Sequence, residues 1–376
     1  MAEPIRVLFV LPSLVGGGAE RVLCTLLKHI DRERSHSALA LFNKTGEYLG
    51  EVPHDVDIID LGKRSRWDAL RLVVELRRLI RRERPHVLLS VLEYTNILTL
   101  LSAVGFTGTR VVVKEANDPT HALALERFGG MKRWLIRVTY PKAARIVAIS
   151  HGIKQCLERH FNVPSRQIEV IHNPIDLDDA ASKMLEPISH PFLQGSNGDA
   201  LIVSAGRLVP QKNFPLLLQA IAHLKDDLPL RLIVLGQGPL RGQLLRLAKE
   251  LGIEERVDFV GFQKNPYAWM SKADAFVLSS DYEGFGNVIV EAMACGVPVI
   301  ATNCSSGPAE IISHRHDGLL VPPGDAVGLA AAIREIVSDK QLGKTLTERA
   351  VVSCRRFAVD TVVARYETLI AQAATG

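Results

Sequence analysis

The chain has 376 residues, of which 47% are hydrophobic and 23% are charged. This composition excludes a disordered chain, and the length allows two domains, each with its own hydrophobic core. No apolar run approaches the roughly 18 to 20 residues of a membrane-spanning helix, and the first residues lead directly into a strand, so we expect a cytoplasmic protein. The five cysteines form no CxxC pair, which argues against a disulfide framework and against a zinc site.

Charge is distributed unevenly along the chain. Residues 1–175 contain 26 Lys and Arg against 18 Asp and Glu, whereas the remainder contains 19 against 23. Two stretches of the basic half, 66–85 and 126–146, mix cationic and apolar residues at helical spacing. Both stretches can be explained as solvent-exposed faces of amphipathic helices. Alternatively, they contact an anionic membrane surface or an anionic lipid acceptor. No zinc-finger or RNP-type motif accompanies the charge, so we expect no nucleic-acid partner.

Strands and helices alternate in two rounds. In the first half, buried strands are predicted at 5–14, 37–43, 56–61, 86–92, 110–116, 145–150 and 168–173. In the second half, they are predicted at 200–208, 230–236, 256–262, 275–280, 298–302 and 318–323. This alternation predicts two doubly wound α/β domains with parallel sheets, which face each other across a cleft. A stretch rich in Pro, Ser, Asn, Asp and Gly at 172–199 predicts the hinge between them.

Three consecutive glycines, Gly16, Gly17 and Gly18, stand between the first predicted strand and a helix. Glycine allows close approach of the backbone to a ligand, and the start of a helix suits a phosphate group. A tight turn is the alternative. The match to the dinucleotide fingerprint is weak, because Arg21 stands where that motif requires glycine. The GKT at 343–345 is interpreted as part of a helix, because Ser338 replaces the upstream glycine of a P-loop.

Two cations follow the first strand of the second half. Arg207 and Lys212 lie five positions apart across a loop that contains a proline. An arginine can bind phosphate through two hydrogen bonds and a lysine acts as a compact charge, so the pair suits a diphosphate. After the next strand, Gly236 and Gly238 flank Gln237 at the start of a helix and offer a further place for close backbone contact.

Two carboxylates, Glu283 and Glu291, lie eight positions apart around the sequence GFGN at 284–287. We predict that Glu283 lies in a loop after a strand, that GFGN begins a helix and that Glu291 lies about two turns along it. Each carboxylate can accept hydrogen bonds from two hydroxyl groups, as a sugar or a ribose offers them. Alternatively, one glutamate complements the helix start and the other is a surface residue.

Several motifs together resemble a known family. They are GRLVPQKN (206–213), DYEGFGNVIVEAMACGVPVIAT (281–302), SSGPAEII (305–312) and GLLVPPGD (318–325), joined in the first half by PSLVGGGAERVL, RIVAISHGI and VIHNPID. The chain resembles the retaining glycosyltransferases of family 4, which have the GT-B fold, over nearly its whole length. The resemblance implies domains at 1–174 and 175–356, with the C-terminal segment 357–376 returning to the first, acceptor-binding domain.

The resemblance also implies roles for individual residues. Arg207 and Lys212 would hold the donor diphosphate, Glu283 the donor sugar and Glu291 the ribose, so that Arg207, Lys212 and Glu283 are the candidate catalytic residues. The base would lie near Gly236–Gly238 and the loop 261–267. The full set of expected donor-binding residues is Gly16, Gly17, Gly18, Gly236, Gly238, Phe285, Gly286, Asn287, Val288 and Glu291.

Negative charge develops on the departing diphosphate, and fixed cations and amides can stabilise it, so we expect neither a metal nor a cofactor. The acidic pairs Asp55/Asp57 and Asp176/Asp178 are interpreted as structural. Many relatives have a histidine where this chain has Ala116. Acceptor-side candidates that could take over part of its role are Glu115, Asn117 and Asp118.

The sequence is most similar to relatives that build bacterial surface polysaccharides and lipid-linked oligosaccharides. This implies a UDP-sugar donor, with a UDP-N-acetylhexosamine favoured, and a glycan or polyprenyl-diphosphate-linked acceptor. Contact with the inner face of an anionic membrane would then explain the basic first half. A GDP-mannose-dependent mannosyltransferase is the alternative. A sugar-nucleotide epimerase or a two-domain solute-binding protein matches the sequence less well.

Overall fold

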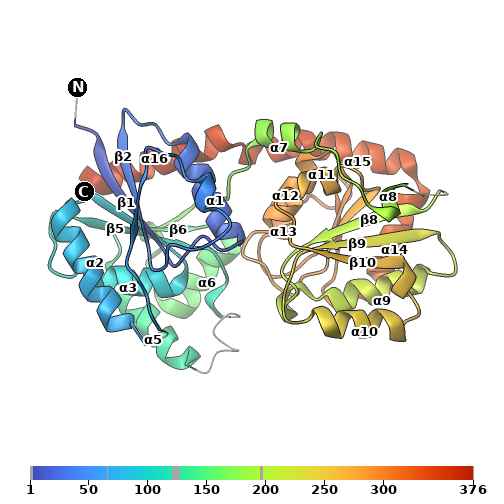
Figure 1. Ribbon diagram of the computed structural model, residues 1–376, viewed down its shortest axis with the longest axis horizontal. Helices are drawn as coiled ribbons and strands as arrows, with labels where there is room; N and C mark the ends of the chain where they lie inside the picture. The colour runs from blue at the N-terminus through green and yellow to red at the C-terminus, as the bar shows by residue number, and fades with distance from the viewer. Residues whose placement is uncertain (1–2, 66, 121–127, 195–197, 376) are drawn as a thin grey trace. The chain divides into compact units, whose positions relative to one another are not determined.

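A computed structural model describes residues 3–65, 67–120, 128–194 and 198–375. The chain forms two compact units (Figure 1). Unit 1 consists of Met1–Pro174 together with Phe357–Gly376, and unit 2 consists of Ile175–Arg356.

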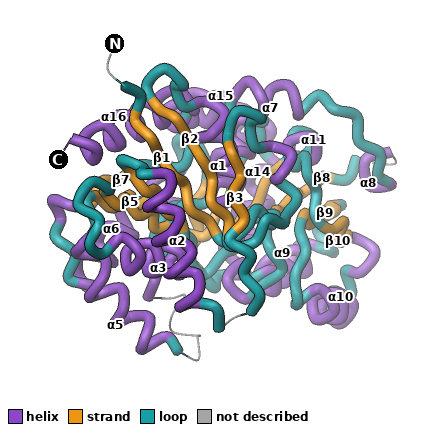
Figure 2. The backbone as a smooth tube through the Cα atoms, turned by 60° about the vertical axis from the view of Figure 1, so that its left-hand side comes forward, coloured by secondary structure: helices purple, strands orange, loops and turns teal. Residues whose placement is uncertain are grey.

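Unit 1 is built on a parallel sheet of seven strands in the order β3-β2-β1-β4-β5-β6-β7. Neighbouring strands β1, β2 and β3 lie side by side in Figure 2. Strand β1 lies in the interior of the sheet and pairs Val7 with Ser37 on one side and with Val87 on the other. The strands are β1 (Ile5–Leu11), β2 (Ser35–Leu41), β3 (Asp57–Asp60), β4 (Val87–Val91), β5 (Arg110–Glu115), β6 (Arg145–Ala148) and β7 (Ile168–Val170).

Helices cover both faces of this sheet (Figure 1). One face carries α1 (Gly18–His29) and α16 (Val359–Thr375), which contact each other. The other carries α2 (Ala69–Glu83), α3 (Glu93–Ala103), α5 (Gly129–Thr139) and α6 (His151–Phe161). Buried Tyr366 and Leu369 of α16 belong to the same hydrophobic core as Phe9 and Leu39 of the sheet. The C-terminal segment is therefore an integral part of unit 1.

Unit 2 has a parallel sheet of six strands in the order β10-β9-β8-β11-β12-β13. The strands are β8 (Ala200–Ala205), β9 (Leu230–Leu235), β10 (Val257–Gly261), β11 (Ala275–Leu278), β12 (Val299–Thr302) and β13 (Leu319–Val321). The helices are α7 (Leu177–Lys183), α8 (Pro191–Gln194), α9 (Phe214–Leu224), α10 (Arg241–Glu250), α11 (Tyr267–Met270), α12 (Asn287–Ala294), α13 (Pro308–Ile311), α14 (Ala326–Ser338) and α15 (Lys340–Ser353).

All thirteen predicted strands are present, and most end earlier than predicted. The strand predicted at 5–14 ends at Leu11, and the one predicted at 200–208 ends at Ala205. The apolar pattern continues beyond the sheet because Leu14 and Leu208 are buried by loop packing rather than by strand pairing. The GKT at 343–345 lies in α15, as predicted.

The described part of the segment 172–199 contains more helix than predicted. It contains α7, in which the Asp176 side chain accepts a hydrogen bond from the Asp179 amide at 2.9 Å and caps the helix start. The sequence pattern missed this helix because Ala180 is its one buried residue, so its sequence shows no apolar stripe. Helix α7 belongs to unit 2 and contacts α11 and α12 there.

Candidate active site

The predicted donor site residues of unit 2 lie at the carboxyl ends of neighbouring strands. Strands β9, β8, β11 and β12 are adjacent and parallel, so the loops that follow them meet at one edge of the sheet. In doubly wound sheets this edge is where ligands bind. The loops are 206–213, 236–240, 279–286 and 303–307.

Lys212 and Glu283 form an ion pair at this edge. The Lys212 Nζ lies 2.5 Å from Glu283 Oε1, and the side chains are 15% and 7% exposed. The Ser280 hydroxyl donates to the same carboxylate oxygen at 2.6 Å. Within the described part of the chain, Oε2 accepts no hydrogen bond. Two residues predicted separately, one for the diphosphate and one for the sugar, are thus brought into contact, with one carboxylate oxygen left for a ligand.

The loops that carry this pair are fastened to each other. The Asp281 amide donates to the Gln211 carbonyl, and the Gln211 side-chain amide donates to the Tyr282 carbonyl, both at 2.9 Å. Sequence reasoning missed Gln211 and Ser280. A signal was available for Ser280, because it stands three positions before Glu283, a spacing at which a hydroxyl can reach a carboxylate in the same turn.

Helix α12 begins directly after this loop. Its first residue follows Gly286, which has φ of 101° and provides no side-chain cap. A Cβ on Gly307 would lie 2.1 Å from the Phe285 carbonyl oxygen, so the loop after β12 packs against this turn through its backbone. The Phe285 ring is buried, which leaves the main chain as the part of Phe285 that a ligand can contact. The positive end of the α12 dipole favours an anion at this position.

Glu291 and Val288 lie further along α12. Glu291 is 4% exposed, and Val288 is half-buried. The predicted ribose ligand is therefore a nearly buried carboxylate rather than a surface residue.

Arg207 differs from Lys212 in its surroundings. Its side chain is exposed and makes no hydrogen bond or ion pair with the residues that the structure describes. The two cations predicted to bind a diphosphate are thus in different states, because Lys212 is already paired with a carboxylate.

The glycines that flank Gln237 have a role within the protein. Gly236 has φ of 140°, and a Cβ there would lie 1.9 Å from the Gly206 carbonyl oxygen. A Cβ on Gly238 would lie 2.5 Å from the Leu208 carbonyl oxygen. The loops after β8 and β9 thus pack so closely that neither position has room for a side chain. The predicted base-binding loop 261–267 begins beside them, because the Gly236 amide donates to the Gly261 carbonyl at 2.7 Å.

The triple glycine belongs to unit 1. Gly16 has φ of 43°, Gly17 is the N-cap of α1 and Gly18 is its first residue. A Cβ on Gly17 would lie 2.1 Å from the Glu20 carboxylate, so this carboxylate lies against the start of the helix, where a phosphate was predicted. Sequence reasoning missed Glu20, although a glutamate three positions after an N-cap is the usual place for a carboxylate that folds back over a helix start.

The three acceptor-side candidates lie at the end of β5, where Glu115 is the last strand residue, and have different environments. The Glu115 carboxylate is buried and accepts a hydrogen bond from the Tyr140 hydroxyl at 2.6 Å, and burial raises its pKa to about 8. Asp118 is buried and accepts hydrogen bonds from the Thr120 amide and hydroxyl. Asn117 is exposed. Of the three, Asn117 alone is on the surface.

Other predictions concern residues outside these loops. Asp55 binds Arg32 and Asp176 caps α7, so one aspartate of each acidic pair has a structural partner. All five cysteines are free and buried, and burial raises the pKa of Cys24 to about 12. Among the described residues, no helix is long and apolar enough to span a membrane.

Two family models match the chain. Residues 188–351 match the glycosyl transferases group 1, and residues 16–179 match glycosyltransferase family 4. A Campylobacter jejuni N-acetylgalactosamine-N,N'-diacetylbacillosaminyl-diphospho-undecaprenol 4-alpha-N-acetylgalactosaminyltransferase is 32% identical over 353 residues, which are 92% of this chain and 93% of that protein. A C. jejuni alpha-1,4-N-acetyl-D-galactosaminyltransferase that acts on a GalNAc-containing diNAcBac-PP-undecaprenol is 27% identical over 98% of this chain and 99% of that protein.

Solved structures agree with these matches at the level of the fold. HepE of Anabaena in complex with UDP-glucose superposes with a TM-score of 0.83 at 22% identity, covering 98% of this chain and 100% of that one. WaaG, a glycosyltransferase involved in lipopolysaccharide biosynthesis, superposes with a TM-score of 0.78 at 17% identity, covering 97% and 99%. The family predicted from the motifs is confirmed: the chain belongs to the family 4 glycosyltransferases, has the GT-B fold and is a glycosyltransferase.

Proposed function

We propose that this enzyme transfers an N-acetylhexosamine from a UDP donor to a lipid-linked glycan in the synthesis of a bacterial surface polysaccharide or oligosaccharide. The names of both C. jejuni relatives describe N-acetylgalactosamine transfer to undecaprenol-linked acceptors, and one of them is 32% identical over nearly the whole chain. UDP is the nucleotide that we favour, because HepE of Anabaena, which has the same fold, was solved with UDP-glucose.

The observation that carries the proposal is the Lys212–Glu283 pair beside the start of α12. An ammonium group has three protons, so Lys212 can hold Glu283 and still donate to a phosphate oxygen. Arg207, exposed on the same loop, would bind the diphosphate through two hydrogen bonds. Glu283 Oε2 would accept hydrogen bonds from the donor sugar, and Glu291 from the ribose. The site therefore offers separate groups for each part of a sugar nucleotide.

In the proposed reaction, a hydroxyl oxygen of the acceptor forms a bond to the anomeric carbon while the bond from that carbon to the diphosphate oxygen breaks. The bonding electron pair leaves with the diphosphate, and the hydroxyl proton passes to the departing oxygen. Attack on the face from which the diphosphate leaves retains the configuration. Arg207, Lys212 and the α12 amides stabilise the developing negative charge, and this mechanism needs no metal.

The remaining roles concern the base, the acceptor and the membrane. We place the uracil near Gly236–Gly238 and the loop that begins at Gly261. Unit 1 would bind the acceptor, with Asn117 as the exposed candidate near β5. A cytoplasmic enzyme with this acceptor would associate peripherally with the inner face of the membrane through its basic N-terminal half.

Thermal unfolding of the purified chain with UDP, GDP or ADP tests the donor. A ligand at about 100 times its Kd stabilises the native state by about 2.7 kcal/mol, so UDP should raise Tm clearly and the other two should not. Glu291→Gln should reduce the UDP effect. Glu335→Gln, at a carboxylate that pairs with Arg315 in the same unit, is the matched control. Stabilisation by GDP alone would instead favour a GDP-mannose donor.

Product analysis tests the reaction. The expected products are UDP and an acceptor extended by one N-acetylhexosamine with an α-linkage from an α-linked donor, at a rate that EDTA does not change. A changed donor sugar without acceptor would identify an epimerase. An inverted linkage, or a rate that requires added divalent cation, would contradict the retaining or the metal-independent part of the proposal.

A further inference from the structure

Four buried hydroxyl side chains surround the Lys212–Glu283 pair of unit 2. Two of them directly follow β11, one is the last residue of β12 and one lies in the loop after β12. We call them the hydroxyl set, and they are Ser279, Ser280, Thr302 and Ser306, each at most 5% exposed. Every member donates a hydrogen bond to the pair itself or to the short segment that carries Glu283.

The strand pairing of the sheet ends just before Glu283. The last pair of residues between β11 and β12 is Leu278 with Ala301, and residues 279–283 follow as a loop. A buried carbonyl group outside a strand still needs a hydrogen-bond donor. The Thr302 hydroxyl donates to the Ser280 carbonyl, and the Ser306 hydroxyl donates to the Glu283 carbonyl, both at 2.5 Å. Hydroxyl groups from β12 and its loop therefore hold the main chain of this segment.

The hydroxyl set also holds the two charged residues. The Ser280 hydroxyl donates to Glu283 Oε1, the oxygen that Lys212 binds, and the Ser279 hydroxyl donates to the Lys212 carbonyl at 2.9 Å. Thr302 acts on Glu283 indirectly, because it holds the carbonyl of the residue whose hydroxyl holds the carboxylate. Ser306 acts on Glu283 directly, through its main chain.

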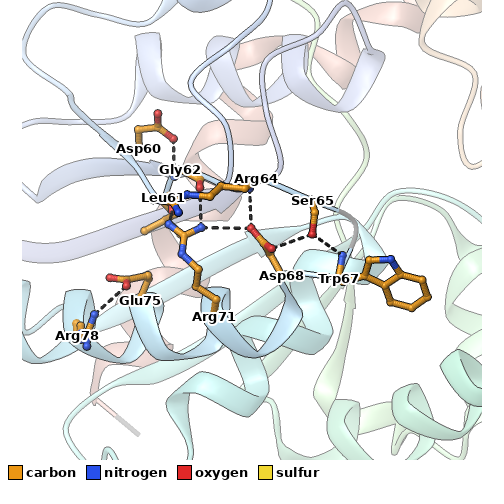
Figure 3. Close-up of polar contacts among 10 residues, drawn as sticks. All are labelled: Asp60, Leu61, Gly62, Arg64, Ser65, Trp67, Asp68, Arg71, Glu75 and Arg78. Atoms are coloured by element: carbon orange, nitrogen blue, oxygen red, sulfur yellow. Dashed lines mark hydrogen bonds and ion pairs between the residues drawn. The ribbon is translucent and has the colours of Figure 1, made fainter.

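A serine and a carboxylate at the same spacing in unit 1 provide a comparison. At the start of α2, the exposed Ser65 donates its hydroxyl to the Asp68 carboxylate at 2.9 Å, within a single turn (Figure 3). The partners of Glu283 come instead from Lys212, 71 positions earlier, and from Ser306, 23 positions later. Donors from separate strands and loops fix a side chain relative to the whole site, which a single turn cannot do.

We propose that Thr302 and Ser306 are positioning residues for sugar transfer, because they hold Glu283 so that its Oε2 meets the donor sugar. Lys212 and Ser280 occupy Oε1, so the place of Oε2 depends on where the Ser280 hydroxyl and the main chain of residue 283 are held. A group misplaced by about 1 Å can slow a reaction about a hundredfold. The inference rests on the proposed role of Glu283 as a ligand of the donor sugar.

Thr302→Val tests the inference, because valine keeps the shape of the side chain and removes the hydroxyl. We expect kcat for sugar transfer to fall about tenfold or more, while Kd for UDP, which lacks the sugar, stays within about twofold of the wild type. Thr302→Ser keeps the hydroxyl and should restore kcat. Thr139→Val is the matched control, since the buried Thr139 donates its hydroxyl to the Leu135 carbonyl at 2.7 Å in unit 1. Wild-type kcat in Thr302→Val, or an equal loss in the control, would refute the assignment.

Two serine variants test the path by which the hydroxyl groups act. Ser306→Ala and Ser280→Ala should each lower kcat without weakening UDP binding, and Ser65→Ala, which removes a hydroxyl at the same spacing from a carboxylate, should leave kcat unchanged. Because Thr302 acts through Ser280, Thr302→Val/Ser280→Ala should be about as slow as the slower single variant. Losses that multiply would show an independent action of Thr302. A loss of UDP affinity equal to the loss of kcat would assign the hydroxyls to folding alone and overturn the proposal.

A measurement without substrate separates the inference from the proposed function. Urea unfolding of Lys212→Met, Glu283→Gln and the double variant gives the coupling between these two residues. In a Thr302→Val background this coupling should fall to about half or less, because Glu283 is no longer held against Lys212. If the wild type transfers no N-acetylhexosamine from a UDP donor but the coupling falls in this way, the proposed function is wrong and the positioning role remains. An unchanged coupling would overturn the inference for any donor.

Discussion

The Lys212–Glu283 pair allows a quantitative test of how the candidate site is held together. Removal of one partner of a buried ion pair leaves the other charge poorly solvated, which costs about 3 to 5 kcal/mol. These side chains are 15% and 7% exposed, and Ser280 still donates to the carboxylate. We therefore expect Lys212→Met to lower the free energy of unfolding of unit 2 by about 3 kcal/mol, at the low end of that range.

Glu283→Gln should cost less, about 2 kcal/mol, because the Lys212 ammonium keeps a hydrogen-bond acceptor and can reach water more easily. In the double variant, no unpaired charge remains. Its cost should fall short of the sum of the single costs by about 2 kcal/mol, as is typical of residues in direct contact.

The assay is urea unfolding in a background in which Trp67 and Trp134 are replaced by Phe. Trp269 in α11 is then the remaining tryptophan, and it is 8% exposed, so its fluorescence reports on unit 2. Sugar transfer should be lost in both single variants and in the double variant, because each lacks a proposed donor ligand. If the sum of the two single-variant costs equals the cost of the double variant to within about 0.5 kcal/mol, the two residues are not coupled.

Three other predictions follow from individual side chains. Arg207→Ala should weaken donor binding by about tenfold or more while leaving Tm of the free enzyme unchanged, because the side chain is exposed and makes no described contact; isothermal titration and thermal unfolding check both. Gly236→Ala should destabilise unit 2 and abolish activity, since a Cβ would lie 1.9 Å from the Gly206 carbonyl oxygen; an active variant with wild-type Tm would contradict this loop geometry. The pKa of Glu115 is about 8 in the folded protein, against an ordinary value of 4.5, so the folded state retains a proton that the unfolded state loses in this window. The free energy of unfolding should therefore fall by up to about 1.4 kcal/mol per pH unit as pH rises from 4.5 to 8. Urea unfolding followed by tryptophan fluorescence measures this dependence, and Glu115→Gln should remove it. The same pH dependence in the wild type and the variant would disprove the assignment to Glu115.

The positions of the strands could be predicted because each is a short apolar run bounded by turn residues. The order of the strands in the sheets could not, because it depends on which edges pair in space. Helix α7 was missed because Ala180 is its one fully buried residue, so its sequence shows no apolar stripe and differs little from that of a loop.

For the candidate site, too, the residue types could be predicted from the sequence, whereas the contacts between them could not. The residue types after β8 and β11 indicated a diphosphate and a sugar, since Arg, Lys and Glu carry that chemistry wherever they stand. Contact between Lys212 and Glu283, which are 71 positions apart, depends on the adjacency of these two strands. Glu115 was an acceptor-side candidate because it stands beside Ala116, but it is the last residue of β5 and its side chain is buried against Tyr140.

By itself, the sequence determined the α/β class, the two rounds of strand and helix, the family and the residue types of the donor site, because these depend on local patterns. The tertiary structure decided which of those residues are exposed, which are paired and which glycines serve loop packing. Burial and contact are properties of neighbours in space, and residues far apart in the chain become neighbours when the sheets form. Helix α5 illustrates both: the spacing of its apolar residues was visible in the sequence, but the structure decided that Ile136 is buried and Trp134 is exposed.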